Sequence, residues 1–591
     1  MVLGKRGLAG TAQSAGTEGC GRAQLGLPEV APGATRLLTI LVAAGVLGMP
    51  VAAVGQGSTA FLGVSVVRVD GKPRVLPDQT VVVRAGRIVA AGPAASTKLP
   101  AGVIRVDGKG KFLMPGIAEM HGHLPGDDAP PEVGEQWMKL FVANGVTTVR
   151  GVLGAGNQLA MRERIRKGEL LGPQLFVYGP PLHGDLVKTP EVGVQKVKEF
   201  KQAGYDGIKI QEGLSLDSYQ AIAREAKRLR FPFGGHVPND VGLERALAAG
   251  QQSIEHLDGY LEALAPPGSP SATEPGKGPF INGRSPALDH LDEGRIPALV
   301  AATRKARAMV VPTMSLWKTL MVGAPLAELQ KRPELVYFAP RVVDDWIRAQ
   351  REAEKDPPPA DRVRKLLTLR DRVLAALAAQ PDLVMLGSDS PQRFSVPGFS
   401  LHHEVRAMIQ AGMTPAQIVY AGTLAPARYL GKEKDFGTVQ VGKRADLILA
   451  EANPLDDPAN MFRTAGVVVN GRWLPRRELD GMLVEIENAL RFPPAAEIKD
   501  LPIPTGEAAA LAGRYSHEKI DVTVASKDGK LTLTAHDPKG DRTERMRSQG
   551  GGVYLIPEVK AKIQFEMKDG RAAALIGSQG GAQFRAARVG P

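Results

Sequence analysis

Cysteine is almost absent from this 591-residue chain, and the only one, Cys20, lies near the N-terminus. The rest of the chain can form no disulfide bond, so its folded state depends on packing and not on cross-links. Cys20 also lacks the apolar residues just upstream that a lipoprotein attachment site needs. Any metal held by the remaining chain must therefore have histidine, carboxylate or lysine-derived ligands.

Aromatic residues and concentrated charge are scarce as well. Phe, Trp and Tyr make up 5% of the chain, and the net charge of +12 is spread along it without a dense basic segment. No aromatic stacking platform or known nucleic-acid motif accompanies the charge. We interpret the positive charge as solvation of the surface, and we expect no nucleic-acid partner.

Long apolar runs are limited to one, LLTILVAAGVLGMPVAAVGQG, which follows Arg36. A basic residue, an apolar stretch and small residues between Ala53 and Gln56 are the parts of a secretory signal peptide. A retained membrane anchor is the alternative, but Gly and Pro interrupt the run, which is short for a span. We expect residues 1–56 to be a cleaved leader, with no stable membrane insertion afterwards, and the mature protein to be periplasmic or secreted.

Glycine and proline, by contrast, are abundant, with 68 and 46 residues. They divide the chain into regions that differ in their predicted pattern of strands and helices. Over 57–113, short strands separated by DG and AG turns predict a small β domain. Over 114–435, short apolar runs alternate with helical stretches about eight times, which indicates a (β/α)8 barrel. Strands and turns return over 436–480, and we expect this segment to complete the β domain.

Two longer stretches interrupt the alternation of strands and helices in the barrel region, and the chain continues beyond the β domain. Residues 265–286 form a loop rich in Pro, Gly and Ser, and 323–365 form a charged helical insertion. Both follow late candidate strands, so both could overhang the active face. We interpret 481–510 as a linker and 511–591 as a separate all-β domain, because its apolar and polar residues alternate between DG turns. Whether this domain binds a partner, covers the substrate or only stabilises the chain stays open.

Metal-binding residue types gather where the candidate barrel strands end. In MPGIAEMHGHLPG, His121 and His123 share one face of an extended segment, because residues two apart point the same way. Active sites of such barrels lie at the carboxyl ends of the strands. The fourth, fifth, sixth and eighth strands end near Lys209, His236, His256 and Asp389. Each one alone is as easily structural, but their joint positions predict a metal site.

The ordered motifs MHGH, GIKI, GGHV, SIEH and GSDS resemble the metal-dependent amidohydrolase superfamily, and within it the imidazolonepropionase-like and Xaa-Pro or Xaa-Arg dipeptidase branch. GELLGPQLFVYGPPL, AGMTPAQIVYAGTLAPARYLG and GTVQVGKRADLILAEANPL are similar to that family too, so the resemblance covers about 58–475. It implies a TIM barrel with a composite β-sandwich built from segments on both sides of it. The C-terminal β domain lies outside this family core.

The resemblance also implies two divalent metal ions. His121, His123 and Asp389 would bind the first ion, and His236 and His256 the second. With only nitrogen and oxygen ligands, zinc is the default, although manganese or cobalt could substitute.

Lys209 cannot bridge the ions as an ammonium group, because it has no lone pair. The resemblance implies a carboxylated lysine, and an ordinary lysine in a salt bridge is the alternative. A hydroxide bridging the ions would attack the substrate carbonyl, and Asp389 would shuttle the proton to the leaving amine. A bridging lysine favours hydrolysis of an amide, ester or phosphotriester at a binuclear centre.

The leading hypothesis is a hydrolase that cleaves C–N amide bonds of small molecules such as dipeptides or N-acyl amino acids. Hydrolysis of lactones, carbamates or organophosphates is one alternative, and a non-catalytic exported binding protein is another. An oligomer is possible.

Candidate substrate contacts are less well defined. In the dipeptidase branch a Tyr closely follows the histidine of the fifth strand, but the sequence here is HVPND. Tyr178 or Tyr260 could take its place, although either is as easily a packing residue. Arg150 and Arg393 follow candidate strands and could bind a substrate carboxylate.

Overall fold

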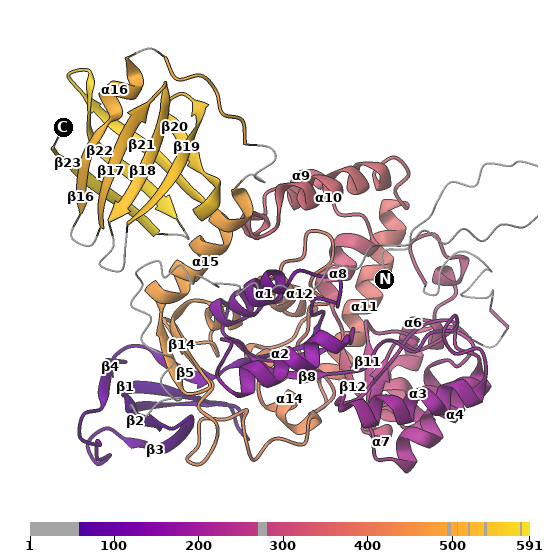
Figure 1. The fold of residues 1–591 in the computed structure, drawn as a ribbon. Helices are drawn as coiled ribbons and strands as arrows, with labels where there is room; N and C mark the ends of the chain where they lie inside the picture. The colour runs from indigo at the N-terminus through magenta and orange to yellow at the C-terminus, as the bar shows by residue number, and fades with distance from the viewer. Residues whose placement is uncertain are drawn as a thin grey trace, which may run out of the picture. The chain divides into compact units, whose positions relative to one another are not determined.

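A computed structural model of the chain (Figure 1) describes residues 58–266, 268–269, 281–492, 498–504, 506–517, 520–536, 541–579 and 582–590. The expected leader, 1–56, lies outside the described residues, as does most of the expected loop 265–286. No helix of the described ranges is both long enough and apolar enough to cross a membrane.

Parallel strands form a closed barrel, as the alternating pattern predicted. Seven of them are β6 (Ile117–Gly122), β7 (Val146–Gly151), β8 (Gln174–Val177), β9 (Ile208–Ile210), β10 (Phe233–Gly235), β11 (Ser253–Glu255) and β12 (Met309–Val311). The eighth position is taken by the extended segment 383–389. Its backbone bonds to β12 through Val310 N–H and Leu383 O at 2.8 Å, and to β6 through Met120 N–H and Leu386 O at 3.0 Å. A bridge between Tyr178 and Gly207 joins β8 to β9.

Helices that follow the strands surround the barrel. They are α1 (Pro131–Ala143), α2 (Gly156–Arg166), α3 (Pro190–Ala203), α4 (Leu216–Arg228), α5 (Leu243–Ala249), α6 (Tyr260–Ala263), α7 (Ile296–Ala306), α11 (Ala360–Ala378), α12 (Ser400–Gln410), α13 (Pro415–Gly422) and α14 (Leu424–Tyr429). Local chemistry sets their ends. The hydroxyl of Ser215 accepts the Ser218 N–H at the start of α4, and Gly204 supplies the left-handed residue that ends α3.

The insertion predicted over 323–365 is helical. It contains α9 (Leu326–Leu329), a 3-10 turn (Pro333–Tyr337) and α10 (Pro340–Ala353), and it follows α8 (Met314–Leu316) and a π-helical turn (Trp317–Met321). Glu334 anchors it to α12, because its Oε1 lies 2.6 Å from Nε2 of His403. Arg332 adds a second anchor by donating to the carbonyl of Phe394 at 2.6 Å.

Strands from both sides of the barrel form a single sheet in the order β15-β14-β13-β5-β1-β2-β3, with β4 paired to β1. The first group is β1 (Ser58–Arg68), β2 (Arg74–Arg84), β3 (Arg87–Pro93), β4 (Ile104–Asp107) and β5 (Phe112–Pro115), and the second is β13 (Leu447–Ala450), β14 (Thr464–Val469) and β15 (Arg472–Pro475). The antiparallel β5–β13 pair joins the two groups, with Leu113 opposite Leu449. The sheet is therefore composite as expected, while its arrangement as a two-layered sandwich stays a prediction.

The linker expected over 481–510 is partly helical. Helix α15 (Arg476–Arg491) runs across the expected boundary at 480, because its buried side chains Leu479 and Ile486 continue one apolar face. A short helix, α16 (Glu507–Leu511), precedes the last domain.

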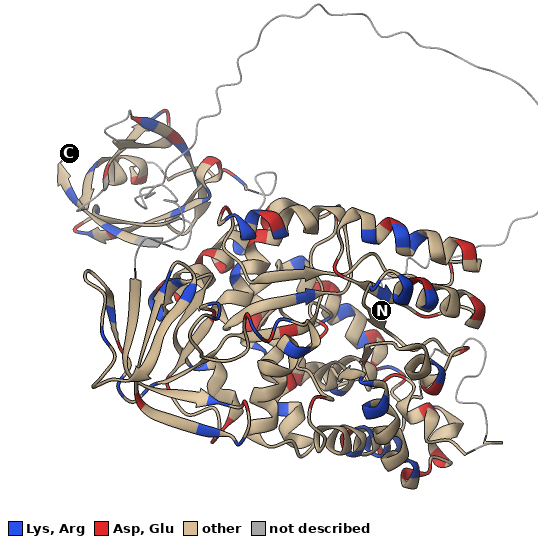
Figure 2. Ribbon diagram, turned by 90° about the horizontal axis from the view of Figure 1, so that it is seen from below, with Lys and Arg blue, Asp and Glu red and all other residues tan. Residues whose placement is uncertain are grey.

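The C-terminal domain is all-β, as predicted, and its strands close into an antiparallel barrel. They are β16 (Gly513–His517), β17 (Ile520–Lys527), β18 (Lys530–His536), β19 (Arg542–Gly550), β20 (Val553–Ile556), β21 (Ala561–Lys568), β22 (Arg571–Gln579) and β23 (Ala582–Gly590). Two buried tyrosines hold α16 to this barrel: Tyr515 donates to the Leu511 carbonyl at 2.5 Å, and Tyr554 to Glu507 at 2.7 Å. Figure 2 shows basic and acidic positions interspersed over the strands and helices of the chain.

Candidate metal centre

The two histidines of MHGH lie at the carboxyl end of β6, beside the end of the eighth barrel segment. Oδ1 of Asp389 lies 2.9 Å from Nε2 of His123 and 3.4 Å from Nε2 of His121. The backbone holds the same register, because Asp389 N–H donates to the His121 carbonyl at 2.9 Å. The structure thus brings together the three residues expected to hold the first metal ion.

His236 and His256 continue this group along the ends of β10 and β11. The ring centroids of His121 and His256 are 4.7 Å apart, and those of His256 and His236 are 4.8 Å apart. Donor atoms of His121, His256 and Asp389 all lie within 4.8 Å of one another. The expected ligands therefore form one continuous cluster at the mouth of the barrel.

Each of three histidine rings is oriented by a partner on Nδ1. This atom lies 2.7 Å from Glu255 in His121, 2.7 Å from Asp258 in His236 and 2.7 Å from Thr313 in His256, measured to a side-chain oxygen. Metal-binding histidines usually carry such a partner on the ring nitrogen that does not bind the metal, and this partner fixes the orientation of the ring. The rings are thus prepared for coordination through Nε2.

Lys209 lies in the middle of β9 and is 3% exposed. Its Nζ has no hydrogen-bond partner and no salt bridge among the described residues, so the alternative of an ordinary salt-bridged lysine finds no support. Burial lowers the pKa of this amine, even though Glu255 and Asp389 act in the opposite direction. A neutral, desolvated amine is the form that reacts with carbon dioxide, so the site suits carboxylation.

The protonation states fit a divalent cation. Burial lowers the pKa of His121 to about 4 and holds the pKa values of His236 and His256 well below their usual range. Burial alone would raise the pKa of Asp389, but His121 and His123 hold it well below its usual range. Neutral imidazoles beside an ionised carboxylate are the donors that zinc and similar ions prefer, so these residues fit the expected metal pair.

The backbone is strained at this centre. His256, Asp389 and Thr313 have φ values of 60°, 60° and 43°, all in the left-handed region. This region is costly for residues other than glycine, above all for a β-branched one such as threonine. Residues held in this way cluster at functional sites, which supports the location of the site independently of the ligand types.

Three of the four expected substrate contacts are buried inside the protein and bonded to other side chains, which does not favour their predicted role. Arg150, Tyr178 and Tyr260 are 0%, 2% and 0% exposed. Arg150 is bound to Glu255, the hydroxyl of Tyr178 lies 3.0 Å from that of Tyr429, and that of Tyr260 lies 2.6 Å from Thr303. A position after a candidate strand does not distinguish a side chain that fills the barrel from one at its mouth.

Arg393 is different, because it lies in the loop just after Asp389 and is only half-buried. No hydrogen bond or salt bridge to it occurs among the described residues, and burial lowers its pKa. It is the one candidate contact of the four with free donors.

Three residues that orient the candidate ligands were not predicted from the sequence: Glu255, Asp258 and Thr313. A fourth, Glu212, lies near them, because one of its carboxylate oxygens is within 4.8 Å of ligand atoms of His236 and Asp258. Burial raises the pKa of Glu212 to about 8. The sequence contains only a weak signal for these orienting residues. Glu255 directly precedes His256 and Asp258 follows it by two residues, but acidic residues are common in loops.

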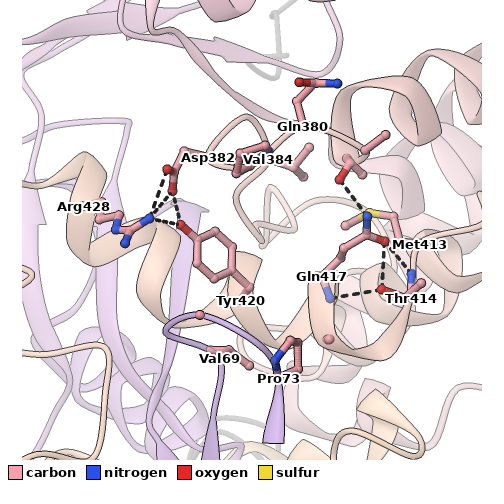
Figure 3. Close-up of a pocket in the computed structure, with 15 residues that line it drawn as sticks. Val69, Pro73, Gln380, Asp382, Val384, Met413, Thr414, Gln417, Tyr420 and Arg428 are labelled. Atoms are coloured by element: carbon pink, nitrogen blue, oxygen red, sulfur yellow. Dashed lines mark hydrogen bonds and ion pairs between the residues drawn. The ribbon is translucent and has the colours of Figure 1, made fainter.

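A cavity of about 520 Å³ lies elsewhere, at the amino end of the eighth barrel segment (Figure 3). Its polar side chains bond to one another: Arg428 donates to Asp382 at 3.0 Å and to Tyr420 at 2.6 Å, and Tyr420 also donates to Asp382. Since the candidate metal ligands lie at the carboxyl ends of the strands, this cavity is not part of their site.

The chain belongs to the amidohydrolase family, whose model matches residues 112–474. The resemblance seen in the sequence is thereby confirmed. A comparison with curated protein sequences finds no match.

Solved structures share the fold at low sequence identity. One is a putative prolidase from Bifidobacterium longum, with 24% identity and a TM-score of 0.51, covering 73% of this chain and 99% of that one. Another is a bottromycin amidohydrolase, with 21% identity and a TM-score of 0.56, covering 75% and 94%. A third is a Xaa-Pro dipeptidase with bound methionine, with 18% identity and a TM-score of 0.50, covering 71% and 100%.

Proposed function

We propose that this chain is a binuclear metal-dependent hydrolase that cleaves C–N amide bonds of dipeptides or N-acyl amino acids. The observation that carries the proposal is the cluster of His121, His256 and Asp389, whose donor atoms lie within 4.8 Å of one another. The unpartnered Nζ of Lys209 supports a bridging carboxylated lysine. Since all ligands are nitrogen or oxygen atoms, zinc is the ion we expect.

Two bound cations would lower the pKa of a coordinated water and polarise the substrate carbonyl. The chain's own residues would supply the rest. Asp389 is an ionised carboxylate at the mouth of the barrel, so it can take a proton on an oxygen and pass it to the leaving amine. The rings of His121, His236 and His256 keep their orientation, because Nδ1 of each is held by a neighbouring side chain.

Arg393 is our candidate for binding the carboxylate of the substrate. It follows Asp389 by four residues and has no protein partner among the described residues. An arginine binds a carboxylate through two parallel hydrogen bonds, which also fixes its orientation. Dipeptides and N-acyl amino acids both carry such a group, and the neighbouring prolidase and Xaa-Pro dipeptidase structures agree with this class.

Export is a further part of the proposal. It rests on the composition of residues 1–56 alone. Edman sequencing or mass spectrometry of the N-terminus of the mature protein tests this export proposal. A mature protein that still begins at Met1 would contradict it.

The test of activity uses the chain from about residue 58, prepared with zinc and bicarbonate. It is incubated with pooled dipeptides and N-acyl amino acids, with and without a chelator, and released amino acids are identified by mass spectrometry. We expect chelator-sensitive release from a defined subset. If protein shown to hold two metal ions releases nothing, the amide substrate is wrong, and lactones, carbamates and phosphotriesters are tested in its place.

A further inference from the structure

A buried carboxylate links one metal-ligand histidine to an arginine inside the barrel. Glu255 is 0% exposed, and its Oε2 lies 2.7 Å from Nδ1 of His121. Its Oε1 accepts a hydrogen bond from Nη2 of Arg150 at 2.7 Å and another from Oγ of Ser253 at 2.7 Å. Both oxygens are occupied by partners from β6, β7 and β11, so the carboxylate cannot turn without breaking these bonds.

Arg150 is itself fixed on several sides. Its Nε donates to the Met120 carbonyl at 2.6 Å, and its Nη1 donates to Ser253 at 2.8 Å and to Tyr429 at 3.0 Å. The rings of Tyr178 and Tyr429 lie 5.3 and 5.2 Å from its central carbon. A guanidinium has only donors, so the group that faces it must be an acceptor.

We propose that Glu255, held by Arg150, is a positioning residue that fixes the tautomer of His121 and thereby sets the affinity of the first metal ion. The inference rests on the proposed function, because it requires the metal centre. A carboxylate accepts hydrogen bonds only, so Nδ1 of His121 carries the proton. Nε2 then presents its lone pair toward Asp389, which lies 3.4 Å away.

Among the described residues, the candidate ligands of the second ion have no equivalent arginine-held carboxylate. Nδ1 of His236 faces Asp258, whose other oxygen has no hydrogen-bond partner among the described residues. Nδ1 of His256 faces the hydroxyl of Thr313, which can donate or accept. The arginine therefore acts on one side of the centre only, and its removal should affect one ion more than the other.

The first variant is Glu255→Gln in the full chain. The amide must turn its oxygen toward Arg150, so its NH2 group faces Nδ1 of His121. Nδ1 then has to accept, and Nε2 carries the proton and loses its lone pair. In a competition titration with a chromogenic chelator after metal removal, we expect one of two zinc equivalents to bind about 10–100-fold more weakly, the range for loss of an outer partner.

The second variant adds Arg150→Met to Glu255→Gln. Without the arginine, the amide can turn and offer its oxygen to His121. We expect the weakened zinc equivalent to regain part of its affinity, whereas a purely structural role predicts a further loss. If the double variant does not fold, Ser253→Ala replaces it, because it removes one of the bonds that hold Glu255 and should weaken the same equivalent to a smaller extent.

The matched control is Asp446→Asn. Asp446 is 4% exposed and forms a buried ion pair with Arg444, and within the described part of the chain it makes no bond to a histidine. This variant should unfold at a lower temperature and bind zinc as the wild type does. If Glu255→Gln titrates like Asp446→Asn, the inference is overturned. If the wild-type chain binds no zinc, the proposed function fails first, and this inference with it.

Discussion

Nε2 of His123 lies 2.9 Å from Oδ1 of Asp389, although the two residues belong to the first and last segments of the barrel. The contact exists because the barrel closes: the eighth segment pairs with β6, and Gly122 bridges to Ser390. Barrel closure, and not any single segment, therefore brings these two candidate metal ligands together.

If the proposed function is right, replacing Lys209 with alanine would remove a bridging ligand of the metal pair. We expect kcat/KM to fall by more than about 100-fold, because loss of even an outer-shell partner costs 10–100-fold. Zinc content by plasma mass spectrometry should fall in parallel, and added propionate should restore part of the activity by filling the vacated space. Lys443→Ala is the control, since Lys443 is also buried but lies outside the barrel mouth. Unchanged zinc binding in Lys209→Ala would contradict a bridging role.

Replacing Arg393 with methionine should weaken the binding of substrates that carry a free carboxylate. A hydrogen bond to a charged group is worth about 1.5–3 kcal/mol, so kcat/KM should fall roughly 10–100-fold. The C-terminal amide of the same substrate is the control, because it has no carboxylate to lose. Equal losses for the two substrates would assign Arg393 a structural role.

The grouping of the candidate ligands could be predicted from the sequence because it depends on strand ends. The apolar runs predict the strands, and barrel geometry places the carboxyl ends of all strands at one face. His121, Lys209 and Asp389 could therefore be grouped from the sequence alone. The eighth strand was predicted in the right place but is interrupted. A Cβ at Gly387 would lie 2.8 Å from the backbone nitrogen of His121, so only glycine allows this close approach.

The residues around the ligands could not be predicted in this way. Thr313 meets His256 from a segment 57 residues away, and periodicity specifies the face of a strand but not its partner across the barrel. Arg150 and Arg393 looked equivalent in the sequence. Their difference arises because Arg150 lies within β7 and points into a filled barrel, where the charge must be paired, whereas Arg393 lies beyond the eighth segment.

Replacing Thr313 with valine tests whether its hydroxyl orients His256, a candidate ligand of the second ion. Valine keeps the branched shape but cannot bond to Nδ1 of His256, which lies 2.7 Å from the threonine hydroxyl. We expect one zinc equivalent to bind about tenfold more weakly, at the lower end of the usual range for such partners. Thr303→Val is the control, because its buried hydroxyl bonds to Leu299 and Tyr260 and to no ligand. Zinc binding that is the same in both variants would show that Thr313 does not orient the ring.

The stability that the helical insertion gains from Glu334 should depend on pH. Burial raises the pKa of this carboxyl, but the hydrogen bond and charge of His403 outweigh burial, so the folded pKa lies below the ordinary value of 4.5. The Glu334 carboxylate therefore contributes stability above its ordinary pKa of 4.5, and this contribution is lost as the pH falls through the lower folded value.

Glu334→Gln should accordingly lower the free energy of unfolding at pH 7 by about 2 kcal/mol, as expected for a buried charged hydrogen bond. The difference from the wild type should shrink when urea unfolding is repeated below pH 4, because the wild-type carboxyl is then being protonated as well. Glu328→Gln is the control, since the side chain of Glu328 is 65% exposed in its pair with Lys331 and should contribute little at either pH. A difference for Glu334→Gln that persists unchanged at low pH would mean that the side chain acts through its shape, and that the ion pair with His403 does not hold the insertion to α12.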